Sequence, residues 1–133
     1  MAQSSIPPRM LFLDVNILME LFFERTKRGQ VASTVLSYDD TRLATSMIAI
    51  STFFYFVEKH KYDKNLAHDF IANYVLLSVD LPDYSWAKDN DQGDFEDALQ
   101  VACALRHGCK IFMTLDIDLA KQYKKHISTK LIS

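Results

Sequence analysis

The sequence is poor in the two residues that interrupt regular structure, with three Gly and three Pro among 133 residues. Linkers and disordered tails are usually rich in such residues and poor in apolar ones. Here 49% of the residues are hydrophobic and 24% are charged. The composition therefore predicts an ordered globular chain, and its length predicts one domain. We expect residues 1–9 to be a flexible segment and residues 10–133 to be the domain.

Cysteine and long apolar runs are also scarce. The two cysteines, Cys103 and Cys109, cannot make a disulfide framework and are better explained as buried free thiols in a reducing compartment. No apolar run approaches the ~20 residues that span a bilayer. The opening segment lacks the apolar core of a signal peptide. These absences predict a cytoplasmic protein without a membrane partner.

An excess of positive charge is missing as well, because the formal net charge is −2. Proteins that bind nucleic acid through a general electrostatic field are usually basic. Any contact with nucleic acid must therefore use a local basic patch or a bound cation.

What the sequence does have is an alternation of short apolar runs and amphipathic segments. Alternating strands and helices predict an α/β fold with a mainly parallel sheet and right-handed crossovers. The predicted strands are 10–13, 42–45, 75–79, 110–114 and 130–132. The predicted helices are 17–22, 31–36, 47–61, 65–73, 81–88, one that opens at residue 94 and ends before Gly108, and 119–125.

Acidic residues recur where these strands end or the next helices begin. Asp14 follows the first strand, and Asp116 and Asp118 follow the strand at 110–114. Asp94 and Asp97 are three residues apart at the start of a helix, so they share one face of it. Each residue alone could be a helix cap or a first-turn carboxylate.

The acidic set is harder to explain by capping than its single members are. Asp14, Asp97 and Asp116 should all meet at one edge of a parallel sheet, where open α/β sheets bind their ligands. Grouped carboxylates repel one another unless a cation lies among them. Oxygen ligands in this number favour Mg²⁺ or Mn²⁺, and no His or Cys spacing suggests zinc. Such an ion can activate water for phosphodiester hydrolysis.

Two segments resemble the PIN-domain family of small metal-dependent ribonucleases. FLDVNILMELF is similar to the opening strand, Asp and Asn of that family, and GDFEDALQVACAL with IFMTLDIDL is similar to its later acidic segments. The resemblance runs from Met10 to about Ile132. It implies a three-layer α/β/α fold with a mainly parallel sheet of four to five strands.

The resemblance also implies an activity and its partners. The activity would be endonucleolytic RNA cleavage with Mg²⁺ or Mn²⁺. Many relatives are toxins of bacterial toxin–antitoxin pairs and are often dimeric, so a partner antitoxin and a homodimer are expected.

By position, the family's roles fall on residues already singled out. Asp14 and Asp97 would be primary metal ligands and Asp116 the fourth acid, with Asp118 competing for that place. Asp94 would be an auxiliary catalytic acid. Asn16, Ser51 and Thr114 would be supporting residues, Asn16 by a hydrogen bond to Asp14.

The sequence departs from the family on the helix after the second strand, where a Glu is usual. The matching position is Ser51, next to Thr52, and a hydroxyl can hold water but cannot replace a carboxylate charge. Glu20 is a weak substitute, and Glu58 lies about two turns too far along. The departure leaves open a binding module with the same fold that has lost activity and pairs with a protein or RNA.

Two further possibilities remain. Lys110, Lys121, Lys124, Lys125 and Arg106 could form a phosphate-binding rim, or could be a solvated helix face. A receiver domain or a haloacid-dehalogenase-like phosphatase also uses an Asp at a strand end. The second group requires Asp-x-Asp, however, and this chain has Asp14-Val15-Asn16.

Overall fold

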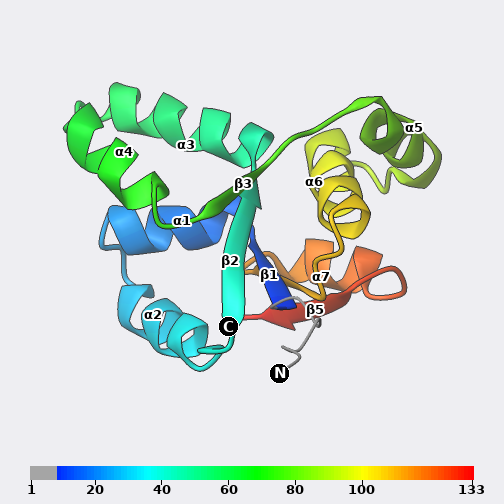
Figure 1. Ribbon diagram of the computed structural model, residues 1–133, viewed down its shortest axis with the longest axis horizontal. Helices are drawn as coiled ribbons and strands as arrows, with labels where there is room; N and C mark the ends of the chain where they lie inside the picture. Colours follow the sequence, from blue (N-terminus) through cyan, green and yellow to red (C-terminus); the bar gives the residue numbers. More distant parts are fainter. Residues whose placement is uncertain (1–8) are drawn as a thin grey trace, which may run out of the picture.

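The computed structural model describes residues 9–133, and most of the segment expected to be flexible lies outside the described residues. Five strands form one sheet in the order β3-β2-β1-β4-β5, and every neighbouring pair is parallel (Figure 1). The strands are β1 (Arg9–Leu13), β2 (Thr41–Ser46), β3 (Val75–Leu77), β4 (Ile111–Thr114) and β5 (Ser128–Leu131).

Helices cover both faces of the sheet, which completes the predicted three-layer α/β/α fold (Figure 1). One face carries α1 (Val15–Phe22), α2 (Arg28–Leu36), α3 (Met47–Lys59) and α4 (Lys64–Ile71). The other carries α5 (Leu81–Asn90), α6 (Phe95–Arg106) and α7 (Ile117–Tyr123). Among the helices of residues 9–133, none is long and apolar enough to cross a membrane.

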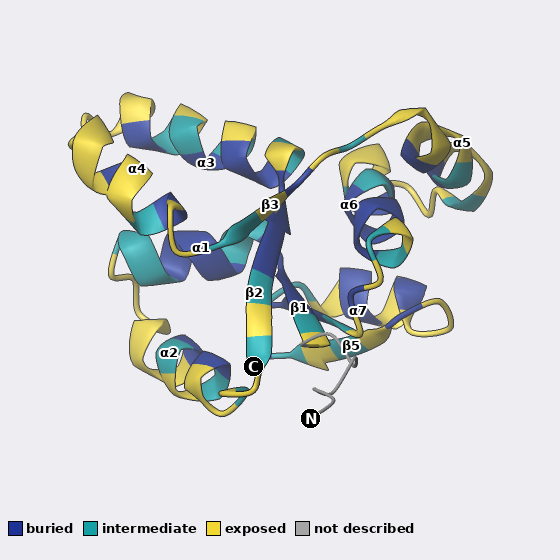
Figure 2. Ribbon diagram, viewed as in Figure 1, coloured by how far each residue is buried: buried dark blue, intermediate teal, exposed yellow. Residues whose placement is uncertain are grey.

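The two helical layers enclose two apolar cores on opposite faces of the sheet. Side chains alternate along β1, so Leu11 and Leu13 enter the core beneath α1 to α4, whereas Phe12 enters the core beneath α5 to α7. Phe12 pairs in register with Phe112 of β4, and their rings stack with centroids 4.8 Å apart. Burial of β1 and β4 on both faces explains the continuous apolar runs MLFL and IFM in their sequences (Figure 2).

Most element predictions are confirmed, and the differences lie near chain ends and edges. The last strand is Ser128–Leu131 rather than 130–132. Its exposure alternates, as expected for an edge strand, so an apolar run does not mark it. The third strand stops at Leu77, and α7 begins at Ile117 because Asp116 caps it. Both cysteines are free and buried, as predicted.

The strand order places a topological switch point between β1 and β4. From β1 the chain adds β2 and then β3 on one side, and β4 and β5 are added on the other. The backbone N–H of Asp14 donates to the carbonyl of Met113 at 3.0 Å, so the carboxyl ends of β1 and β4 lie side by side. Ligands of open parallel sheets bind at this kind of crevice.

Candidate functional site

Asp14 stands at the end of β1 and caps α1. Asp14 is only 3% exposed. Oδ1 accepts a hydrogen bond from the backbone N–H of Val15 at 2.7 Å. Because the first turn of α1 holds it, this carboxylate has a fixed direction at the switch point.

Thr114 and Asn16 fix the other oxygen of Asp14. The hydroxyl of Thr114, at the end of β4, donates to Asp14 Oδ2 at 2.7 Å. Asn16 Nδ2 donates to the same oxygen at 3.1 Å, and Asn16 Oδ1 accepts from the N–H of Leu115 at 3.2 Å. The amide of Asn16 thus ties the residue after β1 to the residue after β4.

Asp116 occupies the equivalent position after β4, as the cap of α7. Its Oδ1 accepts from the N–H groups of Asp118 and Leu119, at 2.9 and 3.2 Å. The negative charge of Asp116 acts on both Asp14 and Asp97, whose pKa values it raises. Asp118 is exposed and contributes only its backbone N–H to this arrangement.

The acidic end of α6 faces the same edge. Gly93, with a φ of 123°, turns the chain into the helix, and Asp94 caps it by accepting from the N–H of Asp97 at 3.1 Å. Burial raises the pKa of Asp97 to about 7, and the charges of nearby carboxylates act in the same direction, namely those of Asp94, Asp14, Asp116 and Glu96.

Asp14 shows the same electrostatic pattern. Its pKa is raised to about 6, chiefly by burial and also by the charge of Asp116, against hydrogen bonds from Thr114 and Val15 that lower it. No Lys or Arg in residues 9–133 forms an ion pair with Asp14 or Asp97. The fold therefore holds these carboxylates close to one another and supplies no cation of its own.

Gln100 is a site residue that the sequence reasoning missed. It lies one turn after Asp97 on α6, is 1% exposed, and its Nε2 is 3.5 Å from Asp14 Oδ1. The available signal was a polar residue on the apolar face of the helix, three positions after an acidic one. Among the buried side-chain N and O atoms of residues 9–133, its Oε1 alone lacks a hydrogen-bond partner.

The helix α3 brings no carboxylate to this edge. Ser51 is exposed, and its neighbour Thr52 donates to Oε1 of Glu96 at 3.3 Å. Glu20 is not a substitute, because it is buried and accepts from the N–H of Lys27 at 2.8 Å. Glu58 pairs with Lys64 at 2.6 Å on the surface.

The donor set fits a magnesium or manganese ion that keeps much of its water. In residues 9–133 no three acidic, His or Cys side chains gather closely enough to hold an ion by themselves. Mg²⁺, however, is usually bound through one or two carboxylates and several waters. Asp14 and Asp97 offer hard oxygen atoms of this kind, and Gln100, whose Nε2 contacts Asp14, has a further oxygen, Oε1, that no group of residues 9–133 uses.

The proposed phosphate rim loses one member. Arg106 donates to both oxygens of Asp83, at 2.8 and 3.0 Å, and to the carbonyl of Ser78 at 2.9 Å. This guanidinium therefore braces α6 against α5. Lys110, Lys121, Lys124 and Lys125 are exposed.

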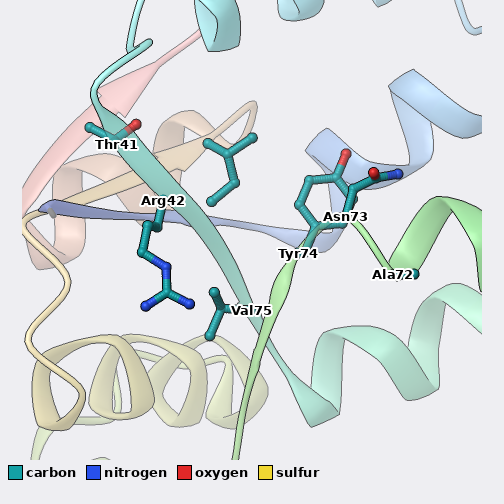
Figure 3. Close-up of a pocket in the computed structure, with 7 residues that line it drawn as sticks. Thr41, Arg42, Ala72, Asn73, Tyr74 and Val75 are labelled. Carbon is teal, nitrogen blue, oxygen red and sulfur yellow. The ribbon is translucent and has the colours of Figure 1, made fainter.

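A hollow lies at the opposite, amino-terminal end of the strands. It has a volume of about 440 Å³ and lies between β2 and the turn that leads into β3 (Figure 3). Its lining includes Arg42 and Tyr74 but no acidic residue. This hollow therefore lacks the carboxylates that gather at the carboxyl edge of the sheet.

The fold and the acids define a class of protein, namely a parallel α/β domain with carboxylates collected at its switch point. Within that class, the chain belongs to the PIN domain family, whose family model matches residues 11–125. No curated protein matches the sequence significantly.

Solved structures of similar fold include proteins from three bacteria. A toxin–antitoxin complex from Klebsiella pneumoniae aligns with a TM-score of 0.70 and 17% identity, covering 90% of this chain and 95% of that one. VapBC2 from Rickettsia felis, bound to a promoter DNA fragment, aligns with a TM-score of 0.68 and 14% identity, covering 93% of this chain and 99% of that one. FitAcB from Neisseria gonorrhoeae aligns with a TM-score of 0.69 and 17% identity, covering 90% of this chain and 96% of that one. At these identities the likeness concerns the fold alone.

Proposed function

We propose that this protein is an endoribonuclease that cleaves RNA with Mg²⁺ or Mn²⁺ and acts as the toxin of a toxin–antitoxin pair. One observation carries the proposal. Asp14 and Asp97 are carboxylates whose pKa values are raised by burial and by neighbouring acids, and no basic side chain of residues 9–133 pairs with them. A divalent cation is the partner that this charge arrangement favours.

In this proposal the ligands are Asp14 and Asp97, supported by Asp116, with Asp118 the alternative to it. A bound divalent cation would polarise the phosphodiester and lower the pKa of water, which is the chemistry that the side chains lack. Asp94, exposed at the mouth of the site, would take a proton from the attacking water.

The supporting residues keep the ligands in position. Asn16 and Thr114 hold Oδ2 of Asp14, so this carboxylate cannot rotate away from the edge. Ser51, which lacks a carboxylate, would contribute at most a hydroxyl for bound water. The site then has fewer charges than a fully acidic one, and weak metal binding is expected.

The partners follow from the fold neighbours and stay proposals. One of the similar structures, that from Klebsiella pneumoniae, is described as a toxin–antitoxin complex, and a small antitoxin protein is the partner that we propose here. A homodimer and a cytoplasmic location belong to the same proposal.

The test combines metal binding and RNA cleavage on the same samples. Wild-type protein is titrated with Mn²⁺ by calorimetry and incubated with RNA, beside Asp97→Asn. We expect saturable binding and cleavage by the wild type, and loss of both in the variant, because Asp97 loses its charge while keeping its size.

Asp69→Asn is the matched control, because Asp69 is exposed on α4 and its side chain makes no ion pair in residues 9–133. It should bind Mn²⁺ and cleave RNA as the wild type does. Cleavage at the wild-type rate by Asp97→Asn would contradict the proposal.

A second candidate function is a binding module that keeps the fold but not the chemistry. It is favoured by the exposed Ser51 on α3 and by the lack of any three clustered metal-binding side chains in residues 9–133. It predicts RNA or protein binding without turnover at any Mn²⁺ concentration. Robust turnover by the wild type would exclude it.

A further inference from the structure

The side chain of Gln100 lies between the apolar interior and the acidic edge. It extends from the middle of α6, with 1% of the residue exposed, and reaches Asp14 across the sheet edge. The contact from Nε2 to Asp14 Oδ1 is 3.5 Å, which is the long end of hydrogen-bond distances. Gln100 is therefore in contact with the acid that is most deeply buried at this edge.

The other end of the same amide has no protein partner. Oε1 of Gln100 is buried and accepts no hydrogen bond from any group of residues 9–133. A buried carbonyl oxygen without a partner destabilises the fold, and native proteins retain one where a water, an ion or a catalytic role accounts for it. An apolar side chain such as Leu would fit α6 without that cost, because its neighbours Ala98, Val101 and Ala104 are apolar and fully buried.

We propose that Gln100 is a positioning residue of the ion site. Its Nε2 holds Oδ1 of Asp14, and its Oε1 accepts a hydrogen bond from a water of the hydrated cation. The proposal rests on the proposed function only in requiring that the acidic edge binds a divalent cation. It does not require that RNA is cleaved.

Gln100 has the right place for this role because it shares a face of α6 with Asp97. The two residues are three positions apart, so their side chains lie one above the other along the helix. Asp97 and Gln100 would then approach the ion from one helix while Asp14 approaches it from β1. A water held by Gln100 would add a third, neutral point of attachment at a site with few charges.

The test compares two substitutions of Gln100 by Mn²⁺ calorimetry and by thermal unfolding without metal. Gln100→Leu removes both hydrogen-bonding atoms at similar size. We expect its Mn²⁺ affinity to fall about tenfold, as for other partners of metal ligands, while its metal-free Tm is equal to or above that of the wild type. Gln100→Glu keeps Oε1 but replaces the Nε2 donor by a charged oxygen beside Asp14, so its metal-free Tm should fall while its Mn²⁺ affinity rises.

Gln122→Leu is the control, because it makes the same chemical change at an exposed position of α7. Its Mn²⁺ affinity should equal that of the wild type. Equal affinities of wild type and Gln100→Leu would overturn the inference and leave the proposed function standing. Saturable Mn²⁺ binding by the wild type without RNA cleavage would overturn the enzymatic function alone. No saturable binding by the wild type would overturn both.

A second measurement uses the wild type only, so it does not depend on how well a variant folds. The side-chain NH₂ signals of Gln100 and Gln122 are followed by NMR during titration with Mg²⁺ and then with Mn²⁺. We expect the Gln100 signal to shift with Mg²⁺ and to broaden with Mn²⁺ before that of Gln122. A Gln100 signal that is unchanged while the protein binds the ion would overturn the inference.

Discussion

Two regions of the molecule bury an aspartate, and they treat its charge in opposite ways. Asp14 at the carboxyl edge of the sheet is 3% exposed, and Asp83 at the junction of α5 and α6 is 1% exposed. Asp83 receives two hydrogen bonds from the guanidinium of Arg106 and one from the N–H of Asp80. Asp14 receives hydrogen bonds from neutral groups only, those of Val15, Asn16, Thr114 and Gln100.

The difference appears in the pKa values. Burial acts to raise the pKa of both side chains, but Arg106 and the Asp80 N–H hold the pKa of Asp83 below its ordinary value. Nothing comparable opposes burial at Asp14, whose pKa is raised to about 6. Asp83, which braces the fold, is thus supplied with a cation by the protein, whereas Asp14, which we propose as a metal ligand, is not.

The largest effect is expected from a change in the acidic site that leaves the pair of Asp83 and Arg106 intact. Asp14→Asn should reduce RNA cleavage by about 10²–10³-fold, the loss typical when one electrostatic group of an active site is removed. The metal-free Tm should change little, because the loss of a buried charge offsets the unfavourable contact between the new NH₂ group and Asn16 Nδ2, which donates to that position. RNA cleavage and thermal unfolding measure the two effects. A lower Tm with unchanged cleavage would assign Asp14 to the fold instead.

A change at Asp83 has the opposite effect, because it removes the pair with Arg106 and leaves the acidic site intact. Asp83→Asn should lower the free energy of unfolding by about 2 kcal/mol, because charge-assisted hydrogen bonds contribute about 1.5–3 kcal/mol. Cleavage per folded molecule and Mn²⁺ affinity should stay at wild-type values. Urea unfolding measures the free energy of unfolding, and calorimetry measures the Mn²⁺ affinity. A variant as stable as the wild type would show that the Arg106 pair contributes nothing.

A smaller effect is expected from adding charge to the site. Ser51→Glu should raise the Mn²⁺ affinity by about tenfold, or about 1.4 kcal/mol, since α3 brings no carboxylate of its own to the acidic edge. Tyr55→Glu, one turn further along α3 and also exposed, is the control and should leave the affinity unchanged. Calorimetry on both variants decides the matter. Equal affinities in Ser51→Glu and wild type would show that α3 does not face the ion.

The smallest expected effect is the pH dependence of the stability that Asp83 contributes. Because the folded pKa of Asp83 lies below the ordinary 3.8, its contribution to stability is complete above that pH and is lost as pH falls through the folded pKa. The stability gap between wild type and Asp83→Asn should therefore narrow in acid. Urea unfolding at a series of pH values measures it. A gap that does not change with pH would mean that charge plays no part in the brace.

Much of the fold was predictable because its central strands are buried on both faces. Continuous apolar runs mark β1 and β4, and capping residues such as Asp14 and Asp94 mark the helices that follow a strand or loop. The edge strand β5 was misplaced by two residues because its sequence, STKL, has no apolar run. The order of the strands could not be predicted, since sequence patterns do not say which strands are neighbours.

The acidic positions were predictable for a different reason. In a parallel sheet every strand ends at the same edge, so an acid after a strand has its place defined by chain direction. The contact between Asn16 and Asp14 was expected from the resemblance to the family and is present at 3.1 Å. Gln100 was missed because it lies in the middle of a helix. There a polar residue is usually solvated, and only the three-dimensional packing shows that this one is buried.

Three of the acids at this edge of the sheet are also helix N-caps. Asp14, Asp94 and Asp116 each accept a backbone N–H from the first turn of the helix that follows. Asn caps helices about as well as Asp does. A single change from Asp to Asn can therefore remove the charge at any of these positions and leave the local backbone as it was. In an evolving lineage, the chemistry that we propose for these acids would therefore be easily lost while the fold is kept, and a single mutation would turn the proposed nuclease into a binding protein.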